Sequence, residues 1–269
     1  MLRLTNVKLP LNHQPEELEQ AILATLNITA EQLTSFSIFK RGYDARKKSN
    51  IILMYTLDVD TTKNAELIAE HAKNQNIKAS PDTRYKFVAQ APETLAQMGF
   101  KPIILERGKE VRQRTKDTFG FWRKKVLNTE SNVQFGEGGA GTFSDGKLYS
   151  QVKDPKHYSR KVLHEFVDAG APAEILYVSK PHIGTFKLVT MVEQMRAEIN
   201  RLGGEVRFEQ RVDDIHFEKV DDDSDNMQVT GLTLATGEVI NTKHIALAIG
   251  HSARDTFAIL KEKGVFIKA

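Results

Sequence analysis

The sequence predicts an α/β protein made of two units, and three observations support this. Residues 1–90 alternate short strand-like stretches with two amphipathic helical stretches. After Ala91 and Pro92 the pattern changes to helices that alternate with fully apolar runs, which is typical of a mostly parallel sheet. A hairpin pattern at 227–240 predicts an antiparallel meander inserted in that sheet. We therefore predict one domain at residues 1–90 and a second at 91–269.

The first unit has the element order β-α-β-β-α-β, which is that of a ferredoxin-like α+β domain. Alternation of apolar and polar residues, or enrichment in aromatic and β-branched residues, predicts its strands. Its first helix opens with Pro15 and two glutamates and repeats Leu18, Ile22 and Leu26 at a spacing of four. The predicted elements are strand 2–9, helix 15–28, strands 35–41 and 50–59, helix 64–75 and strand 84–90.

The second unit opens with "LAQMGF", the last turn of a helix stopped at Gly99, followed by the apolar strand "KPIILERG" at 101–108. Two amphipathic helices follow at 159–172 and 187–204. The second helix ends at Gly203 and places one apolar stripe on a single face: Leu188, Val192, Met195, Ile199 and Leu202. The predicted strands are 205–218, the hairpin 227–240 with its turn at Thr236 and Gly237, and 244–250.

Composition excludes several classes of function. The 269 residues are 40% hydrophobic and 27% charged, an average composition for a globular protein. No cysteine is present, which excludes disulfides, thiolate metal sites and a cysteine nucleophile. The eight histidines form no metal-binding motif, so we predict no metal. A net charge of +3 does not indicate a nucleic-acid partner. No run is apolar enough to span a membrane and the N-terminus lacks a signal peptide pattern, which predicts a cytoplasmic protein with no membrane partner.

Three motif matches fail on their context. "GEGGAG", residues 136–141, matches the dinucleotide fingerprint, but "TFSDGKLYS" follows it where a helix is required. "GTFSDGKL" matches a phosphate loop until Leu148, which lacks the hydroxyl that binds magnesium. "GHSAR" has Arg254 where a serine-hydrolase elbow needs its second glycine. These matches therefore indicate neither a nucleotide triphosphatase nor a serine hydrolase.

Two stretches nevertheless favour a ligand site. Four glycines within six residues are followed by Thr142, Ser144, Asp145 and Gly146, and glycine lets main-chain N–H groups approach a bound group closely. "LAIGHSARDTF" places Gly250 at the end of an apolar strand, and the carboxyl ends of parallel strands are where α/β sheets bind ligands. The alternative for each stretch is an ordinary solvent-exposed loop.

Taken together, these stretches resemble a known family. "TKDTFGFWRKKVLNTESNVQFGEGGAGTFSDGKLY", "SKPHIGTFKLV" and "LAIGHSARDTF" are similar to motifs of bacterial FAD-dependent dehydrogenase-like proteins that carry an N-terminal ferredoxin-like domain. The resemblance implies a chain about twice as long and a Rossmann-type FAD domain of the two-dinucleotide-binding kind. It further implies an oxidoreductase that acts on a small-molecule substrate, with FAD as cofactor and NAD(P)H as a possible electron donor.

The resemblance also implies roles for particular residues. Glu106 would bond the adenosine ribose, since a carboxylate at a strand end can accept from both ribose hydroxyls, and the alternative is a capping or surface glutamate. The glycine-rich loop would wrap the flavin side of the cofactor, and Gly250 would close the site. The full set of cofactor-binding candidates is Glu106, Arg107, Gly136, Gly138, Gly139, Gly141, Thr142, Ser144, Asp145, Gly146, Lys147, Gly250 and His251. No catalytic residue is assigned, although Lys147, His182 and His251 lie in ligand-facing motifs.

Two departures from the family pattern predict weak or lost FAD binding. The family has a strand, a G-x-G-x-x-G turn and a helix directly before "LAQMGF", whereas only the four residues Ala91 to Thr94 stand there in this sequence. The sequence also stops about where the second half of the flavin domain would begin. Losing the turn removes charge-assisted hydrogen bonds to the pyrophosphate that contribute roughly 1.5–3 kcal/mol each. We expect an internally shortened, truncated member of the family.

Two other functions stay open. The first is a non-catalytic binding module, in which five basic residues of the first unit contact an acidic partner or RNA: Lys40, Arg41, Arg46, Lys47 and Lys48. The second is a non-functional remnant. A cooperative melt that shifts upward with added FAD separates this remnant from a flavin enzyme.

Overall fold

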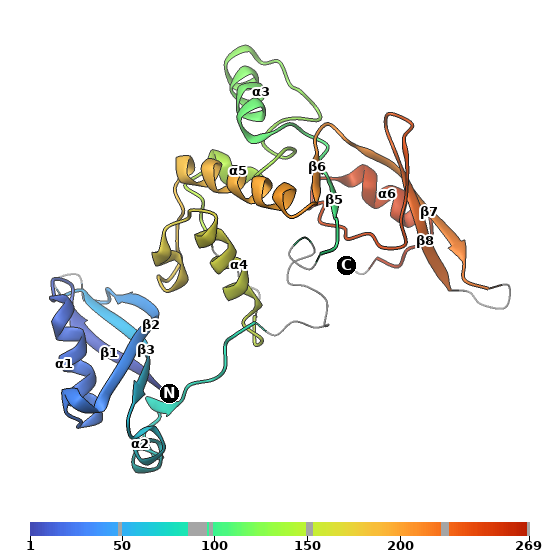
Figure 1. Cartoon of the computed structure of the whole chain (residues 1–269). Helices are drawn as coiled ribbons and strands as arrows, with labels where there is room; N and C mark the ends of the chain where they lie inside the picture. The colour runs from blue at the N-terminus through green and yellow to red at the C-terminus, as the bar shows by residue number, and fades with distance from the viewer. Residues whose placement is uncertain (48–49, 86–95, 97–98, 149–152, 222–225, 268–269) are drawn as a thin grey trace. The chain divides into compact units, whose positions relative to one another are not determined.

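A computed structural model describes residues 1–47, 50–85, 96, 99–148, 153–221 and 226–267 (Figure 1). It is a mixed α/β structure, as predicted, with two compact units that each draw on two stretches of chain. The first unit is Met1–Lys86 with Lys147–Gly184, and the second is Phe87–Gly146 with Thr185–Ala269. The predicted domain boundary at residue 90 lies outside the described residues. No helix among these residues has the length and apolar character needed to cross a bilayer.

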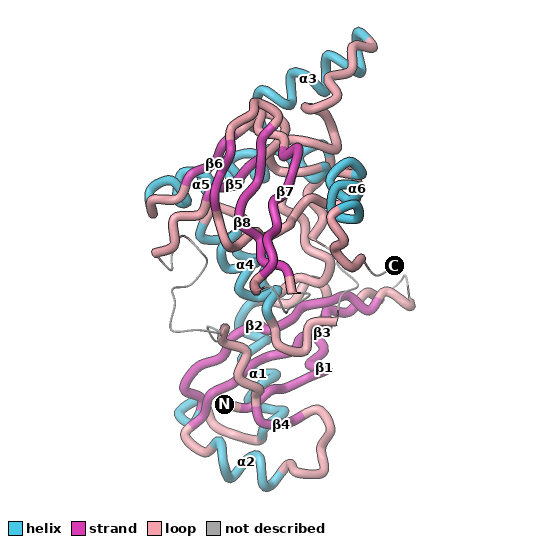
Figure 2. Tube along the Cα trace, turned by 90° about the vertical axis from the view of Figure 1, so that its right-hand side faces the viewer, coloured by secondary structure: helices cyan, strands magenta, loops and turns pink. Residues whose placement is uncertain are grey.

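The first unit contains one four-stranded antiparallel sheet with the strand order β2-β3-β1-β4 (Figure 2). Its elements are β1 (Leu2–Pro10), α1 (Pro15–Leu26), a short 3-10 turn η1 (Ala30–Gln32), β2 (Leu33–Asp44), β3 (Ile52–Thr61), α2 (Asn64–Glu70) and β4 (Ile77–Ala79). The β-α-β-β-α-β order predicted from the sequence is therefore present.

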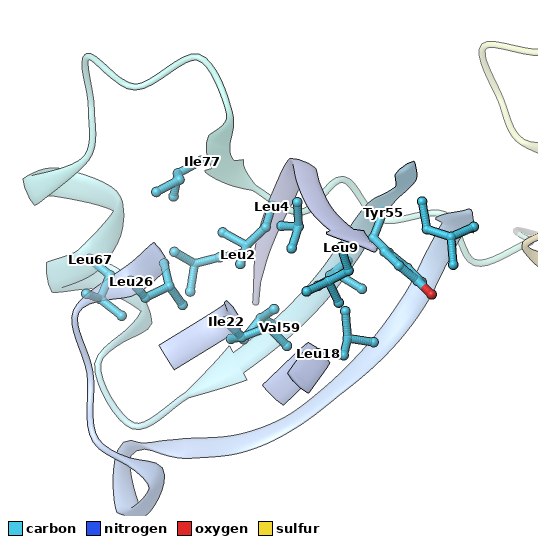
Figure 3. Packing of buried hydrophobic residues seen from close by; sticks show 13 residues of the cluster. Leu2, Leu4, Leu9, Leu18, Ile22, Leu26, Tyr55, Val59, Leu67 and Ile77 are labelled. Carbon is cyan, nitrogen blue, oxygen red and sulfur yellow. The ribbon is translucent and has the colours of Figure 1, made fainter. Parts of the chain in front are cut away.

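The core of this sheet follows from the alternation of its strands. Every second residue of β3 is buried, and β1 keeps its apolar residues on one face because the register shifts between Leu4 and Val7. Asn6 supplies the positive φ of 59° within this bulge, which asparagine tolerates better than most residues. Leu18, Ile22 and Leu26 of α1 pack against the same face, as their spacing predicts (Figure 3).

Two predictions for the first unit were wrong at their boundaries. The fourth strand is Ile77–Ala79, whereas the sequence predicted 84–90; Arg84 and Tyr85 form no strand, and 86–90 lie outside the described residues. A strand of only three residues shows too little alternation to be recognised. Helix α2 ends at Glu70, five residues before the predicted end at 75.

The stretch 147–184 completes the first unit. It contains α4 (Tyr158–Asp168), predicted at 159–172, and a 3-10 turn η3 (Ala173–Leu176). The following residues pair with the free edge of β2, because the Arg41 N–H donates to Tyr177 O at 2.7 Å and the Ser179 N–H donates to Arg41 O at 2.9 Å. This pairing covers an edge that would otherwise expose unpaired backbone groups.

The second unit contains a parallel pair of strands and an antiparallel sheet of three strands (Figure 1). Its elements are β5 (Ile103–Leu105), α3 (Val111–Lys124), the 3-10 turn η2 (Ala140–Phe143), α5 (Thr185–Arg201), β6 (Glu205–Arg207), β7 (Val212–Lys219), β8 (Met227–Leu234), β9 (Val239–Asn241) and α6 (Arg254–Glu262). The predicted helix 187–204 and the hairpin turn at Gly237, with its φ of 87°, are confirmed. Helix α3 was not predicted.

The parallel sheet is smaller than the sequence predicted. Strand β5 pairs in parallel with β6, the first three residues of the predicted strand 205–218, but Ile103 and Ile104 are 42% and 40% exposed rather than buried. The predicted strand 244–250 is not a strand, and Leu247 within it is also exposed. A fully apolar run becomes a buried parallel strand only when neighbouring strands and helices cover it. Among the described residues β5 has a single neighbour, so these apolar runs remain uncovered.

Candidate functional site

The candidate site starts at the carboxyl end of β5, where Glu106 points at the backbone of the glycine-rich loop. Its Oε1 accepts a hydrogen bond from the Gly108 N–H at 2.7 Å and another from the Gly136 N–H at 2.9 Å. Its Oε2 accepts no hydrogen bond within the described part of the chain. Glu106 therefore anchors the loop to the strand end with one carboxylate oxygen and leaves the other available.

A buried arginine that sequence reasoning missed organises the loop from the other side. Arg114, in α3, has no exposed surface, and its guanidinium also lies over the Phe143 ring at 4.8 Å. Its donors reach four carbonyls and one hydroxyl at 2.7–3.1 Å: those of Asn132, Val133, Glu137, Gly139 and Thr142. Burial lowers the pKa of Arg114 to about 10, so it remains a cation at neutral pH. The charge of Arg114 holds the loop in one conformation.

The glycines at 136 and 138 are required by this packing. A Cβ on Gly136 would lie 2.2 Å from Arg114 Cδ, and one on Gly138 would lie 2.5 Å from Thr142 Cγ2. Both residues also have positive φ, 118° and 83°. Gly139 has open space around its Cβ position, and Gly141 would contact Leu188 at 3.2 Å. Gly139 also has a positive φ, 60°, so three of the four glycines are explained by the loop's own fold.

The side chain of Glu137, whose carbonyl accepts a hydrogen bond from Arg114, connects the loop to α3 and α5. Its Oε2 accepts a hydrogen bond from the Val111 N–H, in the first turn of α3, at 2.8 Å and lies 3.4 Å from Arg196 Nη1. Arg196 also pairs with Glu110 at 3.0 Å. Burial raises the pKa of Glu137, although the Val111 N–H and Arg196 act against this rise. The start of α3 is thus tied to both the loop and α5.

Much of the loop's main chain is already hydrogen-bonded within the protein. The N–H groups of Gly136, Glu137, Gly139, Thr142 and Ser144 donate to Glu106, Lys109, Gly136, Gly139 and Gly141 respectively. A phosphate cradle needs several free N–H groups that converge on one point. These five N–H groups do not supply one. Among the groups described above, the second carboxylate oxygen of Glu106 is the one left without a hydrogen bond from the described residues.

The other predicted residues occupy separate places. Thr142 is buried and its hydroxyl donates to Gly139 O at 3.0 Å, whereas Ser144 and Asp145 are exposed and Gly146 is buried with a φ of 67°. Lys147 and His182 form an isolated antiparallel bridge within the first unit. Gly250 and His251 are exposed, and the Ser252 hydroxyl lies 3.3 Å from His251 Nε2. No hydrogen bond among described residues links Gly250 or His251 to the glycine-rich loop.

Arg107 lies at the carboxyl end of β5, where ion pairs and an aromatic ring hold its guanidinium. It pairs with Glu130 at 2.8 Å and with Asp255 at 3.0 Å, and its guanidinium lies 4.2 Å from the centre of the Phe135 ring. Asp255 is in the first turn of α6, five residues after Gly250. This ion pair brings the start of α6 to the carboxyl end of β5, although Gly250 itself makes no such contact.

Arg114 was missed because its sequence context is strongly polar. The neighbouring letters "VRQRTKDT" predict a surface segment, yet the buried residues of α3 are Val111, Arg114 and Thr118. Their spacing of three and then four places them on one helix face. An arginine that shares one helix face with an apolar residue and a small residue, at a spacing of three or four, is therefore the sequence signal that could have identified Arg114 as buried.

Two of the five basic residues proposed to contact an acidic partner, Arg41 and Arg46, have partners within the first unit, whereas Lys40 and Lys47 are exposed. Arg46 is bound by Asp44, with its Nη2 2.6 Å from Oδ2, and this hydrogen bond lowers the pKa of Asp44 to about 2. Arg41 is in β2, next to the Tyr177 ring. Lys48 lies outside the described residues. In the described part of the chain no three histidine, aspartate or glutamate side chains could together hold a metal ion.

Comparison with known proteins adds two findings. Residues 1–60 match a domain of unknown function, DUF8436. Over its full length the chain is 39% identical to a Clostridium beijerinckii protein described as an uncharacterized protein, and it spans about half, 52%, of that relative. The alignment runs over 287 positions and this chain has 269 residues, so at least 18 positions (287 − 269) hold residues of the relative alone. The relative therefore contains at least one segment that this chain lacks.

Proposed function

We propose that this chain derives from an FAD-dependent oxidoreductase and retains only weak affinity for FAD. The observation that carries the proposal is Glu106, a carboxylate at the carboxyl end of a parallel strand, one oxygen of which accepts no hydrogen bond from the described residues. Ligands of α/β sheets bind at that end of the strands, and an acid there is suited to the two hydroxyls of a ribose. The proposed folds are a ferredoxin-like first domain and an incomplete Rossmann-type second domain.

The comparison with the Clostridium beijerinckii protein supports the weak affinity. That relative has at least 18 additional residues within the aligned region. A strand and a glycine turn for pyrophosphate are of about this size. Without such a turn, the cofactor loses several charge-assisted hydrogen bonds, and about 1.4 kcal/mol of lost binding energy corresponds to tenfold in affinity.

Fluorescence of the single tryptophan tests this proposal. Trp122 packs edge-on against Phe143 of the loop, with ring centres 5.7 Å apart, so it reports on the neighbourhood of the proposed site. Titration with FAD should give saturable but weak quenching, and the purified protein should carry no flavin absorbance. Stoichiometric yellow protein would contradict impaired binding, whereas no saturation at millimolar FAD would contradict a flavin site and favour a non-functional remnant.

A conservative substitution locates the site. Glu106→Gln keeps an oxygen that can accept from Gly108 and Gly136 but removes the charge, so FAD should bind about tenfold more weakly. Glu205→Gln is the matched control, because Glu205 is an exposed acid on the neighbouring strand β6 and pairs with Arg207. Equal FAD affinity of the two variants would exclude Glu106 as a ligand.

A further inference from the structure

A separate hollow of about 300 Å³ opens on the second unit near the carboxyl end of β5. Three cationic side chains line it: Arg107, Lys109 and Arg211. Glu130 and Glu209 line it as well, so the walls carry a formal charge of +1. Small-molecule sites of this size are concave and contain a few converging polar groups. The hollow has this character, and Glu106 is not part of its lining.

Glu130 occupies the centre of the cationic group. It pairs with Arg107 at 2.8 Å and with Arg211 at 3.4 Å, so one carboxylate bridges two guanidinium groups. The hydrogen bond from Arg107 is the main cause that lowers the pKa of Glu130, which therefore stays anionic at neutral pH. Guanidinium groups bind carboxylate and phosphate oxygens with the same fork geometry. The Glu130 carboxylate thus marks a position where an external oxyanion would be bound equally well.

A buried hydroxyl points independently to a ligand. Ser131 lines the hollow and is only 1% exposed, yet its Oγ has no hydrogen-bond partner among the described residues. Its backbone is fixed, because the N–H groups of Glu130 and Ser131 both donate to Asn128 Oδ1 at 3.1 Å. A buried hydroxyl without a partner is unfavourable, and an oxyanion in the hollow would accept its hydrogen bond.

The remaining cations can reorient toward a ligand. The Lys109 side chain pairs with Asp117 at 3.0 Å and is partly exposed, and Arg211 pairs with Asp213 at 2.7 Å and is more exposed still. The exposed Arg211–Asp213 pair contributes little free energy, so Arg211 readily exchanges Asp213 for a better partner. Arg107 is held more firmly by its contacts with Phe135 and Asp255. It therefore forms the fixed wall of the hollow.

We propose that this hollow binds a small oxyanion, a phosphate or a carboxylate, which replaces Glu130 between Arg107 and Arg211 and is completed by Lys109 and Ser131. Glu130 then acts as an internal competitor that weakens binding in the unmodified chain. This inference does not depend on the proposed flavin function, because no flavin is needed for the anion to bind.

Calorimetric titration of the full chain with inorganic phosphate, without FAD and at constant ionic strength, tests this site. Lys109→Gln and Arg211→Gln should each weaken binding at least fivefold, and Glu130→Gln should strengthen it at least fivefold by freeing two guanidinium groups. Arg201→Gln is the matched control, because Arg201 is an exposed arginine of the same unit that pairs with Glu198, and it should leave the affinity unchanged. Glu106→Gln should also leave it unchanged, which separates this site from the proposed FAD site.

The gain in affinity for Glu130→Gln is the decisive result, since a misfolded variant would lose binding rather than gain it. A parallel titration with succinate distinguishes the two ligand classes: tighter binding of phosphate identifies a phosphate site, and tighter binding of succinate a carboxylate site. The proposal is overturned if Glu130→Gln binds neither anion, binds them no better than the unmodified chain, or if chloride alone gives the same saturation.

Discussion

The sheet of the first unit and the β5–β6 pair of the second are stabilised by different kinds of contact. In the first unit, buried apolar residues from three strands and from helices α1 and α2 form one continuous cluster. In the second unit, the end of β5 is held by the carboxylate of Glu106 and the guanidinium of Arg114, the largest fully buried side chain among the described residues. Apolar burial tolerates many substitutions of similar volume, whereas a buried ionic network depends on each of its members.

Replacing Arg114 should produce the largest loss of stability. Arg114→Met keeps the volume but leaves four carbonyls and one hydroxyl without their donor, and we expect a cost of about 4 kcal/mol in the second unit. The transition followed by Trp122 fluorescence should move to lower temperature, while hydrogen exchange in β1 and β3 is unchanged. Arg112→Met, an exposed position on the same helix that pairs with Glu193, is the control and should cost less than about 1 kcal/mol.

An Arg114→Met variant as stable as the control would mean that the loop's conformation is fixed by something other than its arginine. Faster hydrogen exchange in both units of Arg114→Met would mean that the two units unfold together. Their different kinds of contact would then not correspond to separate stabilities.

A cavity in the apolar core should give the next largest effect, and in the other unit. Ile22 of α1 is fully buried within the cluster of the first sheet (Figure 3). Ile22→Ala should cost about 3 kcal/mol, because deletion of buried methylene groups loses both transfer free energy and packing. Hydrogen exchange of β1 and β3 should accelerate while the Trp122 transition stays in place. Thr25→Ala, on the exposed face of the same helix, should change stability by less than about 0.5 kcal/mol.

This contrast also explains which parts of the structure could be predicted from the sequence. The strands and helices of the first sheet follow local periodicities, such as Leu18, Ile22 and Leu26, that report burial directly. Strand β4 was not predicted at its position because its three residues, of which Ile77 alone is buried, show no alternation to recognise. Helix α3 was not predicted because its buried face contains an arginine. The burial of this arginine depends on carbonyls about 20 residues away in sequence.

The candidate site was predictable to a similar degree. The position of Glu106 at the end of an apolar run singled it out, and its carboxylate accepts a hydrogen bond from Gly136 of the glycine-rich loop, a contact that the sequence did not predict. The hollow formed by Arg107, Lys109 and Arg211 was not predictable, because its lining combines segments about 100 residues apart. Charged residues in such segments resemble ordinary solvated surface until the fold brings them together.

The smallest expected effect tests whether the β5 edge is uncovered in solution. Ile103→Thr should cost less than about 0.5 kcal/mol, because Ile103 is 42% exposed and loses little burial. The same substitution in the first sheet, Ile77→Thr, should cost about 2 kcal/mol, since Ile77 is only 4% exposed and its replacement buries a hydroxyl. Both residues lie in strands, so the intrinsic strand preference of threonine cancels in the comparison. The thermal transition of Trp122 measures the cost of Ile103→Thr, and the hydrogen exchange of β1 measures the cost of Ile77→Thr. A loss near 2 kcal/mol for Ile103→Thr would mean that another strand covers β5 in solution and that the apolar run is buried after all, as its sequence predicted.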